Sequence, residues 1–255
     1  MASSPLSPKK LVPRLGKGSP LYIQISESLL DRIAAGKLKP GQRLPTERDL
    51  SESLGVNRMT LRQALHRLES QGLLERRQGA GTFIAAPKIE RQAGKLVSFT
   101  RGMQKRGYTP GASVIEFETR PAEASVAREL RVRTSAPVYF IRRLRLVNRE
   151  PALLESYVMP VAYFPRLDRH NLSKRSMYEV LATEYGVQVV RARQSLEPTV
   201  ATEFEARLLG VEQGAPLMLE QRLGFDANDR PVEYGRDLYR GDRFRFVTET
   251  APLEP

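Results

Sequence analysis

The stretch that decides the fold is residues 44–84, LPTERDLSESLGVNRMTLRQALHRLESQGLLERRQGAGTFI. Thr46 carries a side-chain acceptor that can cap a helix over residues 47–54, and Gly55 supplies a tight turn at the end of that helix. Asn57 is placed to cap a second helix. The spacing therefore predicts two helices joined by a short turn.

The second of these helices has two distinct faces. Its apolar residues repeat at helical spacing and form a stripe for burial: Leu61, Ala64, Leu65 and Leu68. Arg58 and Arg62 project away from that stripe, near the start of the helix. Because a polar, basic helix N-terminus suits the major groove of DNA, this helix is predicted to be a recognition helix.

A hairpin is predicted to follow, with strands over residues 73–77 and 82–85. Its tip is Gln78-Gly79-Ala80-Gly81, whose glycines let the backbone approach a phosphate closely. This hairpin has the features of the wing of a winged helix-turn-helix. An earlier helix starts at Ser19-Pro20 and ends at Gly36, so the predicted DNA-binding domain covers residues 19–86.

Positive charge is concentrated in this part of the chain. Residues 1–86 hold 14 Lys and Arg against 7 Asp and Glu, in a chain of 255 residues with a net charge of +12. Such an excess attracts phosphate without selecting a sequence. Residues 1–18 are basic and rich in Ser, Pro and Gly, which predicts a flexible basic arm, and they lack the apolar core of a signal peptide.

The order of these motifs resembles the DNA-binding domain of GntR-type bacterial regulators. The telling segments are LKPGQRLPTERDL at 38–50, VNRMTLRQAL at 56–65 and GAGTFI at 79–84. The resemblance implies DNA contacts from two helices and the wing: Arg48, Asn57, Arg58, Thr60, Arg62, Gln78 and Gly79. Part of the pattern has a plainer explanation, because Asn57 would cap a helix in any such helix pair.

Composition excludes several kinds of site. The chain has no cysteine, which rules out disulfides, Cys-based zinc sites and a cysteine nucleophile, and its two histidines argue against a multi-histidine metal centre. No cofactor is predicted. No apolar run approaches the roughly 18 residues needed to span a bilayer. We therefore expect a cytoplasmic, nucleoid-associated protein with no membrane partner.

A second domain is predicted over residues 95–250, after a polar linker at 87–94. It contains an internal repeat at an offset of 79 residues, in which Ala136-Pro137 and Arg143-Leu144 recur as Ala215-Pro216 and Arg222-Leu223. Each copy is predicted to run as a helix, a turn, a long strand, a polar turn and a return strand. The fold class is therefore α+β, a pseudo-symmetric antiparallel sheet with helices on one side, and the copies are separated by a helix at 177–185 and a strand at 187–196.

Strand periodicity places charged residues of this domain on one face of the sheet. Arg143 and Arg145 share a face of one strand about 7 Å apart, so two guanidinium groups can converge on one anion. The return strands add carboxylates and phenols on matching faces: Glu155 and Tyr157, then Glu233, Asp237 and Tyr239. Such a cavity would suit an anionic ligand with hydroxyl or amino groups, with a sugar phosphate or amino-sugar phosphate favoured. The alternative is a solvated sheet face covered by Arg–Glu pairs.

Residues 95–250 also resemble the UTRA effector-binding domain of HutC-type GntR regulators, whose fold resembles chorismate lyase. The residues that carry this resemblance include LVSFT at 96–100, LESY at 154–157, SMY at 176–178 and EYGRDLYRGD at 233–242. The resemblance supports Arg143, Arg145 and Glu155 as ligand contacts. It further implies contacts from one loop and one helix start: Ser98, Phe99, Thr100, Ser176 and Tyr178.

These features predict a transcriptional regulator that binds DNA as a homodimer. One recognition helix reads few base pairs, and a symmetric pair reading a palindromic operator doubles the site. Repression relieved by a small anionic metabolite is the predicted mode. An enzyme is the alternative from another class, but the chain offers no activated nucleophile or metal set, and a lyase-like fold does not transfer activity. A nucleoid-packing protein would leave the cavity unexplained.

Overall fold

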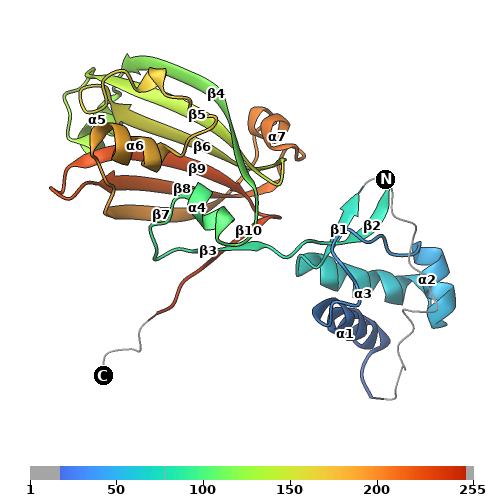
Figure 1. Cartoon of the computed structure of the whole chain (residues 1–255). Helices are drawn as coiled ribbons and strands as arrows, with labels where there is room; N and C mark the ends of the chain where they lie inside the picture. Colours follow the sequence, from blue (N-terminus) through green and yellow to red (C-terminus); the bar gives the residue numbers. More distant parts are fainter. Residues whose placement is uncertain (1–17, 78, 251–255) are drawn as a thin grey trace. The chain divides into compact units, whose positions relative to one another are not determined.

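The computed structural model describes residues 18–77 and 79–250, which divide into two compact units after Lys88 (Figure 1). The predicted arm, up to residue 17, and the wing residue Gln78 lie outside the described residues. No helix in the described ranges is long and apolar enough to cross a membrane.

The first unit is built from helices α1 (Leu21–Ala34), α2 (Glu47–Leu54) and α3 (Arg58–Ser70) and the hairpin β1 (Leu74–Arg77) and β2 (Gly81–Ile84). Both predicted helix caps form. The Asp49 N–H donates to Thr46 Oγ1 over 3.2 Å, and the Thr60 N–H donates to Asn57 Oδ1 over 2.7 Å. Gly55 ends α2 in the left-handed region with φ of 64°.

One apolar core holds these elements together. It includes the predicted stripe of α3 and residues from α1, α2 and both wing strands: Ile25, Leu29, Leu50, Leu61, Leu65, Leu68, Leu74 and Ile84. The chain before α2 extends the wing, because the Leu44 N–H donates to the Thr82 carbonyl over 2.8 Å. The wing is thereby fixed relative to the start of α2.

In the described part of the second unit, six strands form one antiparallel sheet in the order β4-β5-β6-β9-β8-β7 (Figure 1). These strands are β4 (Pro110–Pro121), β5 (Pro137–Val147), β6 (Glu150–Pro160), β7 (Arg191–Val200), β8 (Pro216–Phe225) and β9 (Pro231–Arg240). The helical segments are α4 (Phe99–Gln104), α5 (Ala124–Leu130), the short 3-10 turn η2 (Leu167–Arg169), α6 (Met177–Tyr185) and α7 (Glu203–Leu209).

The internal repeat accounts for this topology. The first copy is α5, β5 and β6, and the second is α7, β8 and β9. The two return strands β6 and β9 adjoin at the centre of the sheet, where Glu155 lies opposite Asp237. The pseudo-symmetry predicted from the sequence is therefore present, and it brings the polar residues of both copies together.

Helices cover both faces of the sheet, which corrects the prediction of helices on one side. Helices α5 and α7 pack against the face that carries Phe140, Leu154 and Leu238. Helix α6 packs against the opposite face, with Tyr139 and Ile141. Side chains of a strand alternate between the two faces of the sheet, and β5 has apolar residues at both odd and even positions. Both faces must therefore be covered by other elements.

The predicted linker at 87–94 is also corrected. Its residues Ile89–Gln92 form strand β3, which pairs in parallel with β10 (Phe244–Val247). The Ile89 N–H donates to the Arg243 carbonyl over 2.7 Å, and the Ile89 side chain is buried. The segment is polar and was therefore interpreted as a linker, although it forms a strand with β10 at the other end of the domain.

The strand predicted at 187–196 lies four residues later, as β7 at Arg191–Val200. The strand runs through Pro198, which has no N–H to donate. Because β7 is an edge strand of the sheet, the missing donor costs no pairing, and a proline there is tolerated.

Candidate functional sites

The predicted recognition helix α3 carries its arginines on the exposed side. Arg58 and Arg62 are both exposed, and Arg62 Nε lies 2.7 Å from Glu47 Oε2. The other Glu47 oxygen lies 3.2 Å from Arg76 Nη2 on wing strand β1. One carboxylate at the start of α2 thus joins the recognition helix to the wing.

The other predicted DNA contacts occupy the surrounding surface. Arg48 is exposed on α2, with its Nε 3.8 Å from Asp49 and 3.9 Å from Glu52. The Asn57 side chain caps α3, which is the structural role considered for it beside DNA contact. Its Oδ1 accepts the N–H of Thr60. Gly79 lies at the hairpin tip with φ of 69°.

The sequence interpretation missed Met59. It is 71% exposed on the first turn of α3, although methionine is an apolar residue. The sequence did contain a sign of this exposure, because Met59 lies outside the buried stripe of the helix. An apolar side chain at the start of a recognition helix can contact the methyl group of thymine.

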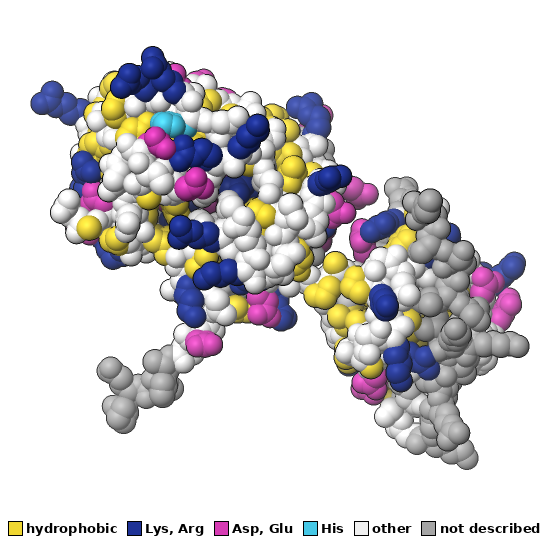
Figure 2. Space-filling model, viewed as in Figure 1, with side chains coloured by type: hydrophobic (Ala, Val, Ile, Leu, Met, Phe, Trp, Pro, Cys, Tyr) yellow, Lys and Arg dark blue, Asp and Glu magenta, His cyan; other side chains and the backbone are white. Residues whose placement is uncertain are grey.

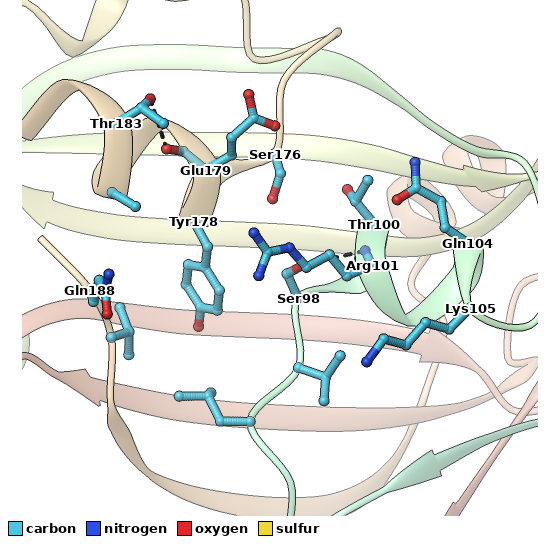
Figure 3. Close-up of a pocket in the computed structure, with 14 residues that line it drawn as sticks. Ser98, Thr100, Arg101, Gln104, Lys105, Ser176, Tyr178, Glu179, Thr183 and Gln188 are labelled. Atoms are coloured by element: carbon cyan, nitrogen blue, oxygen red, sulfur yellow. Dashed lines mark hydrogen bonds between the residues drawn. The ribbon is translucent and has the colours of Figure 1, made fainter. Parts of the chain in front are cut away.

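A cavity of about 530 Å³ opens in the second unit between α4 and α6 (Figure 3). Its mouth is lined from α4 and the preceding segment by Val97, Ser98, Thr100, Arg101, Gln104 and Lys105, and from α6 by Ser176, Tyr178, Glu179 and Thr183. In the space-filling view, basic side chains border the region of these two helices (Figure 2).

Two helix starts meet at this mouth. Ser98 caps α4, and its Oγ accepts the Arg101 N–H over 3.3 Å. Ser176 is the N-terminal residue before α6 and makes no side-chain cap hydrogen bond. The structure therefore brings the predicted residues Ser98, Thr100, Ser176 and Tyr178 to one cavity, as backbone N–H groups and hydroxyls that can donate hydrogen bonds.

The two predicted arginines are buried. They line a separate space of about 20 Å³, called the floor from here on, which adjoins the cavity and shares Val97, Ser98, Ser176 and Tyr178 with it. Arg143 Nη2 lies 2.6 Å from Glu155 Oε2, and Arg143 Nη1 donates to the Leu172 carbonyl over 3.0 Å. Arg145 Nη1 lies 3.2 Å from the same Glu155 oxygen, and its Nη2 donates to Thr100 Oγ1 over 2.9 Å. The Arg–Glu pairs considered as the alternative thus exist, but they are buried next to the cavity and do not form a solvated face.

Glu155 is ionised between these arginines. Burial alone opposes its ionisation, but the charges of Arg143 and Arg145 outweigh burial and lower the pKa to about 2. The Tyr157 hydroxyl donates to Glu155 Oε1 over 2.7 Å. Burial, together with the Glu155 charge, raises the pKa of Tyr157 well above its usual value, so this phenol remains a donor.

The second repeat copy supplies an acidic half of the floor. Arg222, the counterpart of Arg143, contacts Glu233 Oε1 at 3.2 Å, Asp237 Oδ2 at 3.5 Å and Glu220 Oε1 at 3.7 Å. Burial, reinforced by Glu155 and Glu220, raises the pKa of Asp237 well above its ordinary value. Among the described buried side chains, four polar atoms lack a hydrogen-bond partner: Arg143 Nε, Glu220 Oε2, Glu233 Oε2 and Asp237 Oδ1.

Glu233, which was predicted as a ligand contact, lines neither the cavity nor the floor. It is fully buried, and its Oε1 accepts the Tyr178 hydroxyl over 2.6 Å. The space for it comes from Gly224, where an added Cβ would lie 2.7 Å from Glu233 Cγ. Glu233 therefore positions Tyr178, whereas Phe99, Glu155 and Tyr239 do line the floor.

Two further floor residues were absent from the predicted contacts, Arg91 and Arg222. Arg222 had a sequence signal, because the repeat aligns it with Arg143. Arg91 had none, since it comes from the segment interpreted as linker. Within the described residues, no group of three His, Cys, Asp or Glu side chains is arranged to hold a metal ion.

Comparison with known families agrees with both units. The model for bacterial regulatory proteins of the gntR family matches residues 21–84, and the UTRA domain model matches residues 105–245. A crystal structure of PhnF from Mycobacterium smegmatis superposes with a TM-score of 0.65 at 30% identity, covering 89% of this chain and 99% of PhnF.

Curated relatives match over most of their length. The transcriptional repressor NagR of Bacillus subtilis is 38% identical over 228 residues, which cover 89% of this chain and 93% of NagR. The mannosyl-D-glycerate transport/metabolism system repressor MngR of Escherichia coli is 33% identical, over 89% of this chain and 95% of MngR. The chain therefore belongs to the GntR family of DNA-binding transcriptional regulators that carry a UTRA domain, and it is not an enzyme.

Proposed function

We propose that this regulator is a repressor that binds a palindromic operator as a homodimer and is released by a sugar phosphate or amino-sugar phosphate. The observation that carries the proposal is a cavity of about 530 Å³ beside which Arg143 and Arg145 line a smaller adjoining space of about 20 Å³.

The anionic end of the ligand would lie near Arg145 and the two helix starts. Hydroxyls of Ser98, Thr100 and Ser176 stand at this end, and helix N-termini favour negative charge. Phosphate oxygens accept several hydrogen bonds at once, and a planar guanidinium can donate two of them. The lining of the floor includes four arginines, Arg91, Arg143, Arg145 and Arg222, and two carboxyl groups, Glu155 and Asp237, so cationic side chains are in excess there. Burial raises the pKa of Asp237, which acts in the same direction.

The opposite end of the cavity would receive the sugar. Asp237 and Tyr239 line the floor and offer oxygens that accept from hydroxyl or ammonium groups. The unpartnered Asp237 Oδ1 is one such acceptor. The relative MngR, a repressor named for mannosyl-D-glycerate transport and metabolism, supports repression as the mode and a carbohydrate derivative as the ligand.

The test measures DNA release. An operator would first be selected from a pool of random DNA sequences, and its affinity measured with glucosamine 6-phosphate, glucose 6-phosphate and inorganic phosphate. We expect a sugar phosphate to weaken operator binding by about 5- to 150-fold, the usual range of coupling between two sites.

Two variants make the test specific to the cavity. Arg145→Gln and Ser176→Ala should keep operator affinity but lose the response, because they remove donors to the anion while Arg143 still pairs with Glu155. Melting temperatures of the variants would show that folding is intact. Full release in both variants, or a wild type indifferent to every sugar phosphate, would refute the proposed ligand site.

A further inference from the structure

The strand that leaves the DNA-binding unit delivers a side chain to the floor. Strand β3 begins at Ile89, directly after Lys88, where the first unit ends. Arg91, in the middle of β3, lines the floor with Arg145, Asp237 and Tyr239. Its side chain is 15% exposed. The segment that directly follows the first unit thus contributes a side chain, Arg91, to the lining of the floor.

Arg91 is held by groups that belong to the cavity. Its Nη2 lies 3.6 Å from Glu220 Oε2, and its guanidinium carbon lies 5.0 Å from the centroid of the Tyr239 ring. Tyr239 in turn packs edge-on against Phe244 and Phe246 of β10, with both ring centroids at 5.1 Å. The parallel pair of β3 and β10 is therefore fastened to the sheet partly through two floor residues.

The polar network around Arg91 is incompletely satisfied. Among the described residues, the buried atoms Glu220 Oε2 and Asp237 Oδ1 have no hydrogen-bond partner, and the contact of Arg91 with Glu220 is longer than a hydrogen bond. An unpaired buried acceptor is costly in a low-dielectric interior, so a new donor that pairs with it is bound favourably. A ligand hydroxyl or ammonium group at Asp237 would be such a donor, directly across the strands from Glu220, the carboxylate that Arg91 contacts.

We infer that Arg91 is the positioning residue through which a ligand in the cavity acts on the strand leading to the DNA-binding unit. The inference rests on the proposed ligand site. A donor group of the ligand displaces Arg91 from Glu220 and Tyr239, and β3 then changes its position or its order directly after Lys88, where the DNA-binding unit ends. Arg91 is thus needed for the response to ligand, whereas Arg145 is needed for ligand binding.

The experiment separates binding from response in the full chain. Wild type, Arg91→Ala, Arg91→Lys and Arg245→Ala are compared, with glucosamine 6-phosphate as the probe. Arg245 is the matched control, because it lies on β10 and pairs with Glu90 of β3 but its side chain is exposed. Calorimetry measures probe affinity, and fluorescence anisotropy measures affinity for the selected operator with and without the probe.

We expect the probe to weaken operator binding of wild type and Arg245→Ala by about 5- to 150-fold. At probe concentrations that calorimetry shows to be saturating for Arg91→Ala, the operator affinity of this variant should stay unchanged, and Arg91→Lys should recover part of the response. Amide exchange at residues 89–93 should change with the probe in wild type but not in Arg91→Ala. If Arg91 only stabilised the fold, Arg91→Ala would lower the melting temperature, and probe affinity and operator release would change together.

Two results would overturn the inference. Arg91→Ala could release operator as wild type does, or it could lose probe binding, which would make Arg91 a ligand contact only. A wild type that neither binds nor responds to sugar phosphates would instead refute the proposed ligand site. If Arg91→Ala fails to fold, the double variant Arg91→Met with Glu220→Gln removes both buried charges together and gives the same test.

Discussion

At the residue scale, the DNA-binding surface is organised by Glu47. Its carboxylate contacts Arg62 of α3 and Arg76 of the wing, so two arginines of separate elements share one acceptor. These pairs are largely exposed and contribute little to stability. Their effect is geometric, because they hold two cationic side chains in defined directions before DNA arrives.

Substitution of the recognition-helix arginines tests this surface. Arg58→Ala and Arg62→Ala should each weaken binding to the selected operator by about 1–3 kcal/mol if the side chain contacts a base. Arg142→Ala is the control, because Arg142 lies on the sheet and its Nη1 pairs with Glu116 at 2.8 Å. Fluorescence anisotropy measures all three affinities. Wild-type affinity in both recognition-helix variants would contradict the assignment of α3.

The buried Glu155 predicts an acid dependence of stability. Its folded pKa of about 2 is below its ordinary value of 4.5, so its ionised form stabilises the fold above 4.5. That contribution is lost as pH falls through the window from 4.5 to about 2. Glu155→Gln should be less stable than wild type at neutral pH, and the difference should shrink within this window.

Urea unfolding at several pH values measures this difference. The control is Glu197→Gln, which changes an exposed glutamate on β7 and should follow wild type throughout. A constant difference between Glu155→Gln and wild type from neutral pH to the acid end of the window would exclude a role for Glu155 ionisation in stability.

At the element scale, the two repeat copies share a topology but differ in chemistry. The first copy has Arg143 and Arg145 on β5, and the second has Arg222 and Gly224 at the equivalent positions of β8. The absence of a side chain at Gly224 leaves room for Glu233. This divergence gives the floor a basic half and an acidic half, which suits a ligand whose two ends differ in charge.

Gly224→Ala should therefore destabilise the second unit. Its Cβ would lie 2.7 Å from Glu233 Cγ and 3.0 Å from Val189 Cγ1, and such overpacking costs about 1–3 kcal/mol. Gly94→Ala is the matched control, because no atom lies within 4 Å of its added Cβ. Thermal unfolding compares the two variants, and equal melting temperatures would show that Glu233 moves aside freely.

At the scale of the whole molecule, we expect a homodimer held mainly by the second unit. The sheet ends at edge strands β4 and β7, and large apolar side chains are exposed on and near these strands: Ile115, Val190, Val200 and Phe204. Edge strands with exposed apolar residues favour pairing with another chain. A palindromic operator requires two recognition helices in any case.

Sedimentation of separate fragments tests the location of this interface. A fragment of residues 89–250 should sediment as a dimer at micromolar concentration, and a fragment of residues 18–88 as a monomer. A monomeric 89–250 fragment beside a dimeric full-length chain would place the interface elsewhere.

The sequence by itself determined the elements whose signals are local. Thr46 and Asn57 cap helices through residues three positions away, and the stripe of α3 follows from helical periodicity, so near neighbours encode both. The repeat at an offset of 79 likewise predicted a pseudo-symmetric sheet. Strand parity correctly placed Arg143, Arg145 and Glu155 on one face, because the period of two holds whatever the strand pairs with.

Only the tertiary structure decided what depends on distant partners. Strand β3 exists because β10, more than 150 residues later, supplies its hydrogen bonds, and nothing within 89–92 indicates that pairing. Arg91 reaches the floor for the same reason. Glu233 shares the strand face predicted for it, yet it occupies the space at Gly224, accepts the Tyr178 hydroxyl and lines neither the cavity nor the floor. Register between strands and the packing of side chains across them are properties of the assembled sheet, and local sequence patterns do not encode them.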